Sequence, residues 1–326
     1  MMLRAILGCI IFVFLSLTAN SQLAPHFTYF SEFYSQNNPA VAGQGQQFSV
    51  MAIHRSQWIG LASTNLNTQG FSISGPINAI NSGLGATLVR DKIGHQSTIY
   101  FTIDYSYIVK LKEYELAFGV KGGGVFGNLD GAKLRAPEGS YGNGNVNHND
   151  LILPETGSSG AAGDLGVGIS FSGKGLRAGI AMNHLLNSDI SIDNTSGSSG
   201  VTLARTLFAS AGYDLKISRK LTLPIDLTVR TDFVRTQADF QARLVFNRNI
   251  WVGTSFRGYS NSSFDAVSLL FGFHIKKTLA IGYGYDISTS SLSSFNTGSH
   301  EIFISFKKPV KQSGGTGRTI YNPRYL

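Results

Sequence analysis

The chain has 326 residues, of which only 14% are charged, against roughly 25% in a typical soluble protein. Glycine is frequent, at 38 residues, and 22 Phe and 13 Tyr residues make the chain rich in aromatics. The net charge of +8 comes without clusters of basic residues interleaved with aromatics, which argues against a nucleic-acid-binding protein. The one cysteine, Cys9, lies in an N-terminal apolar run, which excludes a disulfide framework and a cysteine-based metal or redox site from the rest of the chain.

The first residues have the pattern of a secretory signal peptide. Arg4 precedes an apolar run over residues 5–17, and Ala19 and Ser21 occupy the −3 and −1 positions of a possible cleavage site. A short membrane anchor is the alternative, but the run is shorter than the ~20 residues that a spanning helix needs. The sequence therefore predicts a Sec signal peptide over residues 1–21 and export of the remaining chain.

From residue 46 onward, apolar and polar residues alternate in one segment after another. In "TLAIGYGYDIS", residues 278–288, one alternate series is aliphatic or tyrosine, and the other is small or polar. Successive side chains of a β-strand point to opposite faces, so each such segment is predicted to be a strand with one apolar face. The fourteen predicted strands are 46–54, 66–75, 82–90, 97–109, 113–125, 161–172, 175–184, 201–214, 220–232, 236–246, 249–258, 264–273, 277–287 and 299–307.

The alternation fits either a soluble β-sandwich, with its apolar faces inside, or a membrane barrel, with its apolar faces toward lipid. Many predicted strands match the ~9–11 residues that a tilted strand needs to cross a bilayer, whereas strands in soluble proteins usually have about five or six. Short, often basic turns such as 110–112 and 247–249 alternate with mostly longer polar loops such as 127–160 and 185–200. We therefore predict an all-β transmembrane antiparallel barrel of about 14 strands with periplasmic termini.

Several charged residues fall on the polar faces of the predicted strands. In a barrel these faces line the lumen, where charges of both signs could pair across the wall. In a soluble sandwich the same side chains would be the solvated exterior. The predicted lumen-lining residues are Lys121, Asp226, Arg230, Asp239 and Arg243.

The sequence carries few signals of catalysis. It has no GxSxG, HExxH or Walker A pattern, and its histidines show no metal-ligand spacing. The candidates for a hydrolase site at a barrel rim are His184 with Asp189 and His300 with Ser299, and neither pair has a persuasive third member. We therefore predict a non-enzymatic protein without a metal or other cofactor.

Two stretches, residues 30–60 and 317–326, contain motifs that a barrel does not require. A tyrosine-containing segment leads into Asn38, Pro39, Ala40 and Gly43, followed by Arg55, Gln57, Trp58 and Gly60, then Gly75, Pro76 and Ile77, then "GLGATLVRDKIG" at 83–94, and finally Asn322, Pro323 and Arg324. In their order and spacing these motifs resemble the PorP/SprF family, the outer-membrane proteins associated with the type IX secretion system of Bacteroidetes. The resemblance covers most of the chain and is weakest over residues 127–160.

The resemblance implies a non-enzymatic barrel of type IX secretion or gliding motility. Such a barrel would anchor a secreted surface protein or adhesin, or assist its export, and would contact the periplasmic secretion components. The candidate partner-binding residues are Arg55, Gln57 and Trp58 near the first strand and Tyr321, Asn322, Pro323 and Arg324 in the tail. Rim packing is the alternative role for the first three, and a simple tether is the alternative for the tail.

The predicted organisation has four parts. A signal peptide over 1–21 is followed by a periplasmic N-terminal segment over 22–45, a barrel over 46–307 in outer-membrane lipid, and a periplasmic tail over 308–326. An alternative function for the same barrel is a passive outer-membrane channel for small solutes, with the inward charges lining its path.

Overall fold

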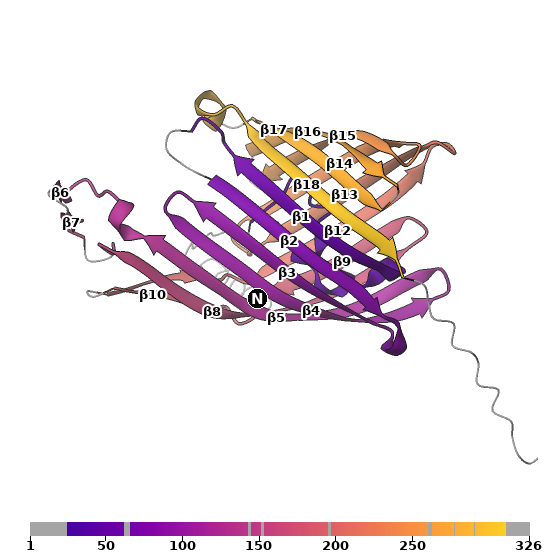
Figure 1. Ribbon diagram of the computed structural model, residues 1–326, viewed down its shortest axis with the longest axis horizontal. Coiled ribbons are helices and arrows are strands. Elements are labelled where there is room, and N and C mark those ends of the chain that lie inside the picture. Colours follow the sequence, from indigo (N-terminus) through magenta and orange to yellow (C-terminus); the bar gives the residue numbers. More distant parts are fainter. Residues whose placement is uncertain are drawn as a thin grey trace, which may run out of the picture.

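The computed structural model describes residues 25–61, 66–142, 145–150, 153–194, 197–259, 263–276, 278–289 and 291–310. Its main feature is a closed barrel of fourteen antiparallel strands (Figure 1), which confirms the predicted fold class. The barrel strands are β1 (Gln47–Gln57), β2 (Leu66–Ile77), β3 (Ser82–Ile93), β4 (Gln96–Leu111), β5 (Tyr114–Asp130), β8 (Gly157–Gly173), β9 (Leu176–Asn183), β12 (Thr206–Lys216), β13 (Leu221–Thr231), β14 (Thr236–Phe246), β15 (Ile250–Tyr259), β16 (Ser263–Ile275), β17 (Leu279–Ser288) and β18 (Ser299–Pro309).

Each barrel strand pairs with its neighbours in the barrel order, and β1 closes the barrel against β18. The closing pair runs from Gln47 opposite Pro309 to Ser56 opposite His300. Closure matters physically because hydrocarbon cannot satisfy an open edge of backbone N–H and C=O groups. Among the residues that the structure describes, no helix is both long and apolar enough to cross a membrane.

The two faces of the wall differ as the alternation predicts. Aliphatic and aromatic side chains on the outside are extensively exposed, for example Ile103 at 53%, Phe126 at 52% and Phe271 at 49%. Inward residues such as Asp104 and Gln241 are buried. A soluble protein does not expose so continuous an apolar surface, so this outer face is suited to contact acyl chains.

The described part of the N-terminal segment contains three short 3-10 helices, η1 (Tyr34–Gln36), η2 (Pro39–Val41) and η3 (Gln44–Gln46). The Asn38 side chain accepts a hydrogen bond from the Ala40 amide, at 2.9 Å, and this contact caps η2. Gly43 has a φ of 68°, and a Cβ there would lie 2.7 Å from the Gly83 Cα. The chain can therefore turn against the wall at this point because residue 43 has no side chain.

This placement differs from the sequence-based assignment of residues 22–45 to the periplasm. The described part, from Pro25 onward, lies inside the barrel, where Phe27, Tyr29 and Phe33 join a buried cluster with wall residues such as Trp251 and Phe303. The physical reason is that these aromatics leave water when they pack in the lumen, and several polar wall groups, such as Lys121 and Asn183, find hydrogen-bond partners on the segment.

Loops between strands add two hairpins that the sequence analysis did not anticipate. One is β6 (Ser140–Gly142) with β7 (Asn145–Asn147), and the other is β10 (Asp189–Asn194) with β11 (Gly197–Thr202). The predicted strand 201–214 therefore began too early, since its first two residues belong to β11. Ile190 of β10 packs on Val125 and Leu203 and is 1% exposed, so this hairpin folds inward over the lumen.

Candidate functional site: the occupied lumen

The N-terminal segment contacts the wall on several sides of the lumen. Lys121 of β5 donates to the Gln36 carbonyl oxygen at 3.0 Å, and Asn183 of β9 donates to the Asn37 carbonyl oxygen at 3.0 Å. Ser106 of β4 donates to the Ala42 carbonyl oxygen at 2.6 Å. The segment is thus held through its backbone carbonyls, by donors that inward-facing strand positions supply.

Glycines of the wall make room for this segment. A Cβ at Gly119 of β5 would lie 2.2 Å from the Ala40 amide nitrogen, and a Cβ at Gly168 of β8 would lie 2.1 Å from the Asn38 side-chain oxygen. Real Cβ atoms do not approach so closely. The high glycine content of the strands therefore has a specific use at these positions, which is to admit η2 against the wall.

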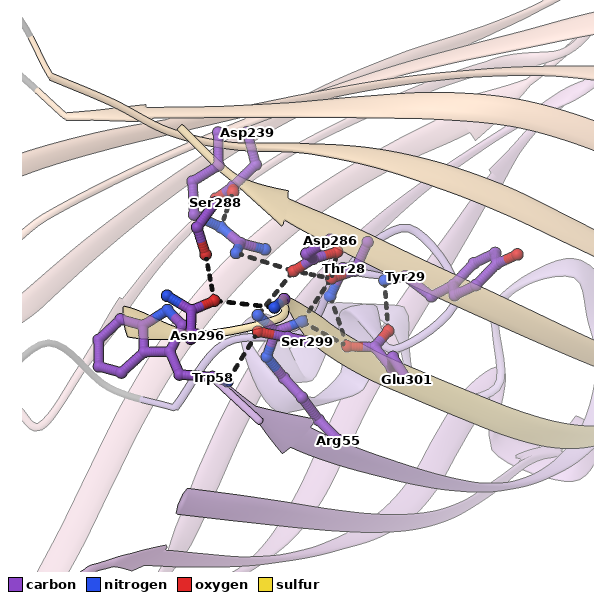
Figure 2. A network of polar contacts seen from close by, with 12 residues as sticks. Thr28, Tyr29, Arg55, Trp58, Asp239, Asp286, Ser288, Asn296, Ser299 and Glu301 are labelled. Atoms are coloured by element: carbon purple, nitrogen blue, oxygen red, sulfur yellow. Dashed lines mark hydrogen bonds and ion pairs between the residues drawn. The ribbon is translucent and has the colours of Figure 1, made fainter. Parts of the chain in front are cut away.

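An ion cluster at the other side of the lumen holds the start of the segment (Figure 2). We call Arg55 of β1, Asp286 of β17 and Glu301 of β18 the acid–arginine cluster. Arg55 Nη2 lies 2.7 Å from Asp286 Oδ2, and Arg55 Nη1 lies 3.3 Å from Glu301 Oε2. All three side chains are at most 2% exposed.

Thr28 occupies the centre of the acid–arginine cluster. Its amide donates to Glu301 Oε2 at 2.7 Å, and its hydroxyl donates to the two oxygens of Asp286 at 2.8 and 2.9 Å. Arg55 Nη1 donates to the same hydroxyl at 2.5 Å. The Tyr29 amide donates to Glu301 Oε1 at 2.7 Å, so one carboxylate accepts the N–H groups of two consecutive residues.

The Tyr29 side chain fills a pocket in the wall and is completely buried. Its ring meets Phe303 edge-on, with centroids 4.6 Å apart. Its hydroxyl donates toward the backbone carbonyls of Phe271 and Tyr283, at 2.9 and 3.1 Å, and accepts from Trp251 Nε1 at 3.3 Å. The pocket therefore recognises both the apolar ring and the polar tip of a tyrosine.

Charge pairing continues along the segment at Glu32. Arg243 Nη1 lies 2.6 Å from Glu32 Oε1, and Lys307 Nζ lies 2.8 Å from Glu32 Oε2. Burial by itself would raise the pKa of Glu32, but Lys307 and Arg243 outweigh it and hold that pKa well below its usual range. The carboxylate therefore stays ionised and serves as the counterion of two basic wall residues.

His26 lies at the other end of the described segment. Burial lowers the pKa of His26 well below its usual range, and the nearby charges of Arg257, Arg230 and Arg55 lower it further. A neutral imidazole is thus the form that fits among these arginines.

The structure places the five residues named as lumen-lining on the inner side of the wall. Lys121 and Arg243 contact the segment directly, as described above. Asp226 Oδ1 lies 3.0 Å from Arg177 Nη2 and accepts from the Tyr34 hydroxyl at 3.2 Å. Arg230 donates to Gln237 at 2.7 Å, and Asp239 lies 2.8 Å from Arg257 Nε. These groups therefore bind the segment or other polar side chains of the inner wall.

The three candidate partner-binding residues near the first strand have different surroundings in the structure. Arg55 is buried in the acid–arginine cluster and contacts the chain's own segment. Gln57 ends β1 opposite Leu66 and is half-buried. The Trp58 amide donates to Ser299 Oγ at 3.1 Å, where the loops after β1 and before β18 meet (Figure 2). Tyr321, Asn322, Pro323 and Arg324 lie outside the described residues.

The rim pairs considered for hydrolysis are not brought together. His184 Nδ1 lies 3.0 Å from Asp164, whereas Asp189 accepts from Thr202 in the β10–β11 hairpin. His300 Nδ1 lies 2.5 Å from the Tyr283 hydroxyl, while Ser299 contacts Trp58. Within the described ranges, no group of three His, Cys, Asp or Glu side chains has the arrangement of a metal site.

Most residues that hold the segment are not among those predicted from the sequence. Asp286 and Glu301 fall on polar strand faces, so the alternation could have added them to the lumen-lining set. Thr28 and Tyr29 precede the first strand. No local pattern indicates that they contact residues more than 250 positions later in the chain.

The fold defines the class of protein as an outer-membrane β-barrel. The solved structures with a similar fold include a TodX deltaS2S3 mutant, a monoaromatic hydrocarbon channel, at 12% identity and a TM-score of 0.50, covering 84% of this chain and 94% of that chain. The Ralstonia pickettii toluene transporter TbuX has 10% identity and a TM-score of 0.48, with 85% and 93% covered. No curated protein sequence matches the chain.

The sequence identifies the family within this class. The family model described as type IX secretion system membrane protein PorP/SprF matches residues 19–306. The chain belongs to the PorP/SprF family, which confirms the resemblance seen in the sequence motifs. Fold and family together support a location in the outer membrane.

Proposed function

We propose that this barrel is a non-enzymatic outer-membrane component of type IX secretion and gliding, which anchors a secreted surface protein or assists its export and contacts the periplasmic machinery. The observation that carries the proposal is the match of nearly the whole chain to the PorP/SprF family. The occupied lumen supports an anchoring role, because a barrel of fourteen strands whose interior holds residues 25–46 has no room for a folded cargo. Its rims and loops are then the surfaces left for partners.

The two rims suit different partners in this proposal. The long loops, including the β6–β7 hairpin, project on one side and would hold the surface protein (Figure 1). The opposite rim carries the short turns and the end of β18, and would face the periplasmic components. The basic residues of the short turns, such as Lys112 and Lys174, would favour acidic partner surfaces there.

The test is affinity purification of the barrel from its own membranes, with an affinity tag inserted in the turn between β6 and β7. We expect a large secreted surface protein and type IX components to co-elute. A variant that ends after Val310 should lose the periplasmic components and keep the surface protein. An unrelated tagged barrel from the same membranes is the control, and recovery of the same proteins with that control would contradict the proposal.

The alternative of a passive solute channel makes an opposite prediction about conductance. The cavities along the segment are small, about 30 Å³ beside Lys121 and about 150 Å³ beside Lys307. We expect the intact barrel to show no steady open-channel current in planar bilayers. A steady current at the level of a known open porin would favour the channel instead.

A further inference from the structure

The contacts of Thr28 and Tyr29 have the form of ligand recognition. One Glu301 carboxylate binds two consecutive backbone N–H groups, and Gln241 donates to the Thr28 carbonyl oxygen at 3.1 Å. These groups recognise the backbone of the turn that contains Thr28 and Tyr29, whatever its sequence. The hydroxyls of Thr28 and Tyr29 then each contact dedicated partners, which recognise side chains.

The acid–arginine cluster does not need the segment to balance its charges. Arg55 pairs with both Asp286 and Glu301, and Arg257 lies within 3.5 Å of Asp286. An unpaired buried charge would be costly, but here each acid of the acid–arginine cluster keeps a basic neighbour without Thr28. The site can therefore persist while its occupant leaves.

A route toward the short-turn rim lies beside the segment. The cavity of about 150 Å³ is lined by Glu32 of the segment and by Thr278 and Pro309 near the short-turn ends of β17 and β18. The cavity therefore extends from Glu32 toward that rim.

We propose that the lumen contains a peptide-binding site, formed by the acid–arginine cluster and the Tyr29 pocket, which takes a turn-forming segment with a hydroxyl residue followed by tyrosine. Thr28 and Tyr29 occupy it as an intramolecular ligand, and a peptide of the same chemistry from another chain can replace them. This site is separate from the secretion role proposed above, so either can fail alone.

The binding test uses a variant that lacks residues 25–36 and a fluorescent peptide with the sequence of those residues, measured by polarisation in detergent micelles. We expect saturable binding, with about 10- to 100-fold weaker binding when the peptide carries Val for Thr28 or Phe for Tyr29, because each change leaves buried polar groups unpaired. Glu301→Gln in the barrel should weaken binding of the unchanged peptide. A scrambled peptide that binds equally well would overturn the proposal.

The intact chain should bind the same peptide far more weakly, since its own segment is present at high effective concentration. A covalent tether tests this point without relying on the shortened variant. A Cβ at Gly284 would lie 3.6 Å from Thr28 Cγ2, which suits a disulfide in Thr28→Cys/Gly284→Cys, made with Cys9→Ser. We expect the oxidised form to exclude the peptide and the reduced form to bind it. Equal binding by both forms, or failure of the pair to oxidise, would contradict the assignment.

Discussion

At the scale of single residues, the acid–arginine cluster brings three charged side chains together in the buried interior of the barrel. Arg55 is 2% exposed and neutralises two carboxylates that are themselves buried. A charge pair in this setting contributes little net stability as a pair, but loss of one partner leaves the other charge unpaired in a medium of low polarity. Arg55 was named from the sequence as a partner-binding residue, and the structure shows it binding the chain's own Thr28.

We predict that Arg55→Leu lowers the free energy of unfolding by about 3–5 kcal/mol, because Asp286 and Glu301 lose their shared counterion. Urea unfolding in lipid vesicles measures this change. The control is Glu113→Gln, which removes an exposed pair with Lys174 and should cost at most about 1 kcal/mol. Similar losses for the two variants would contradict the buried-charge argument.

At the scale of elements, the strands lie close to the bounds predicted from the sequence. The sequence did not predict that the N-terminal segment lies in the lumen. Strand β14 has the predicted bounds, 236–246, and most other strand ends moved by three residues or fewer. Alternation is a local property of each strand, so the sequence carries it directly. The segment over 25–46 has no such period, and its place depends on partners throughout the barrel.

A substitution at Gly119 tests how closely the segment packs against β5. We predict that Gly119→Ala destabilises the barrel by about 1–3 kcal/mol, because the added methyl group would overlap the Ala40 amide of η2. Gly122→Ala is the matched control on the same strand, since its Cβ would meet only Leu165 at 3.4 Å. Thermal unfolding of both variants gives the comparison. Equal stability of the two variants would mean that η2 shifts to accommodate the added methyl group.

At the scale of the whole molecule, the apolar outer surface makes the barrel suited to lipid rather than to water. Outward residues from all around the wall are apolar, and the inner face is filled by polar pairs and by the N-terminal segment. The arrangement inverts that of a soluble protein, and the low charge content follows from it.

We predict that Leu269→Arg, near the middle of β16 on the outer face, costs about 2–4 kcal/mol of folding free energy in a bilayer. Phe295→Arg, in the exposed η6 (Ser291–Phe295), should be close to neutral because it meets water. Equilibrium folding into vesicles measures both variants. A neutral result for Leu269→Arg would mean that this face does not contact lipid.

The sequence by itself determined the strands, their two faces, the closed barrel and the family motifs, because each is written in local order along the chain. It also placed Lys121, Asp226, Arg230, Asp239 and Arg243 on the polar faces. Only the tertiary structure decided what fills the lumen. Thr28 and Tyr29 meet Asp286 and Glu301 through closure of the whole barrel, and contacts across such separations depend on geometry that no local pattern records.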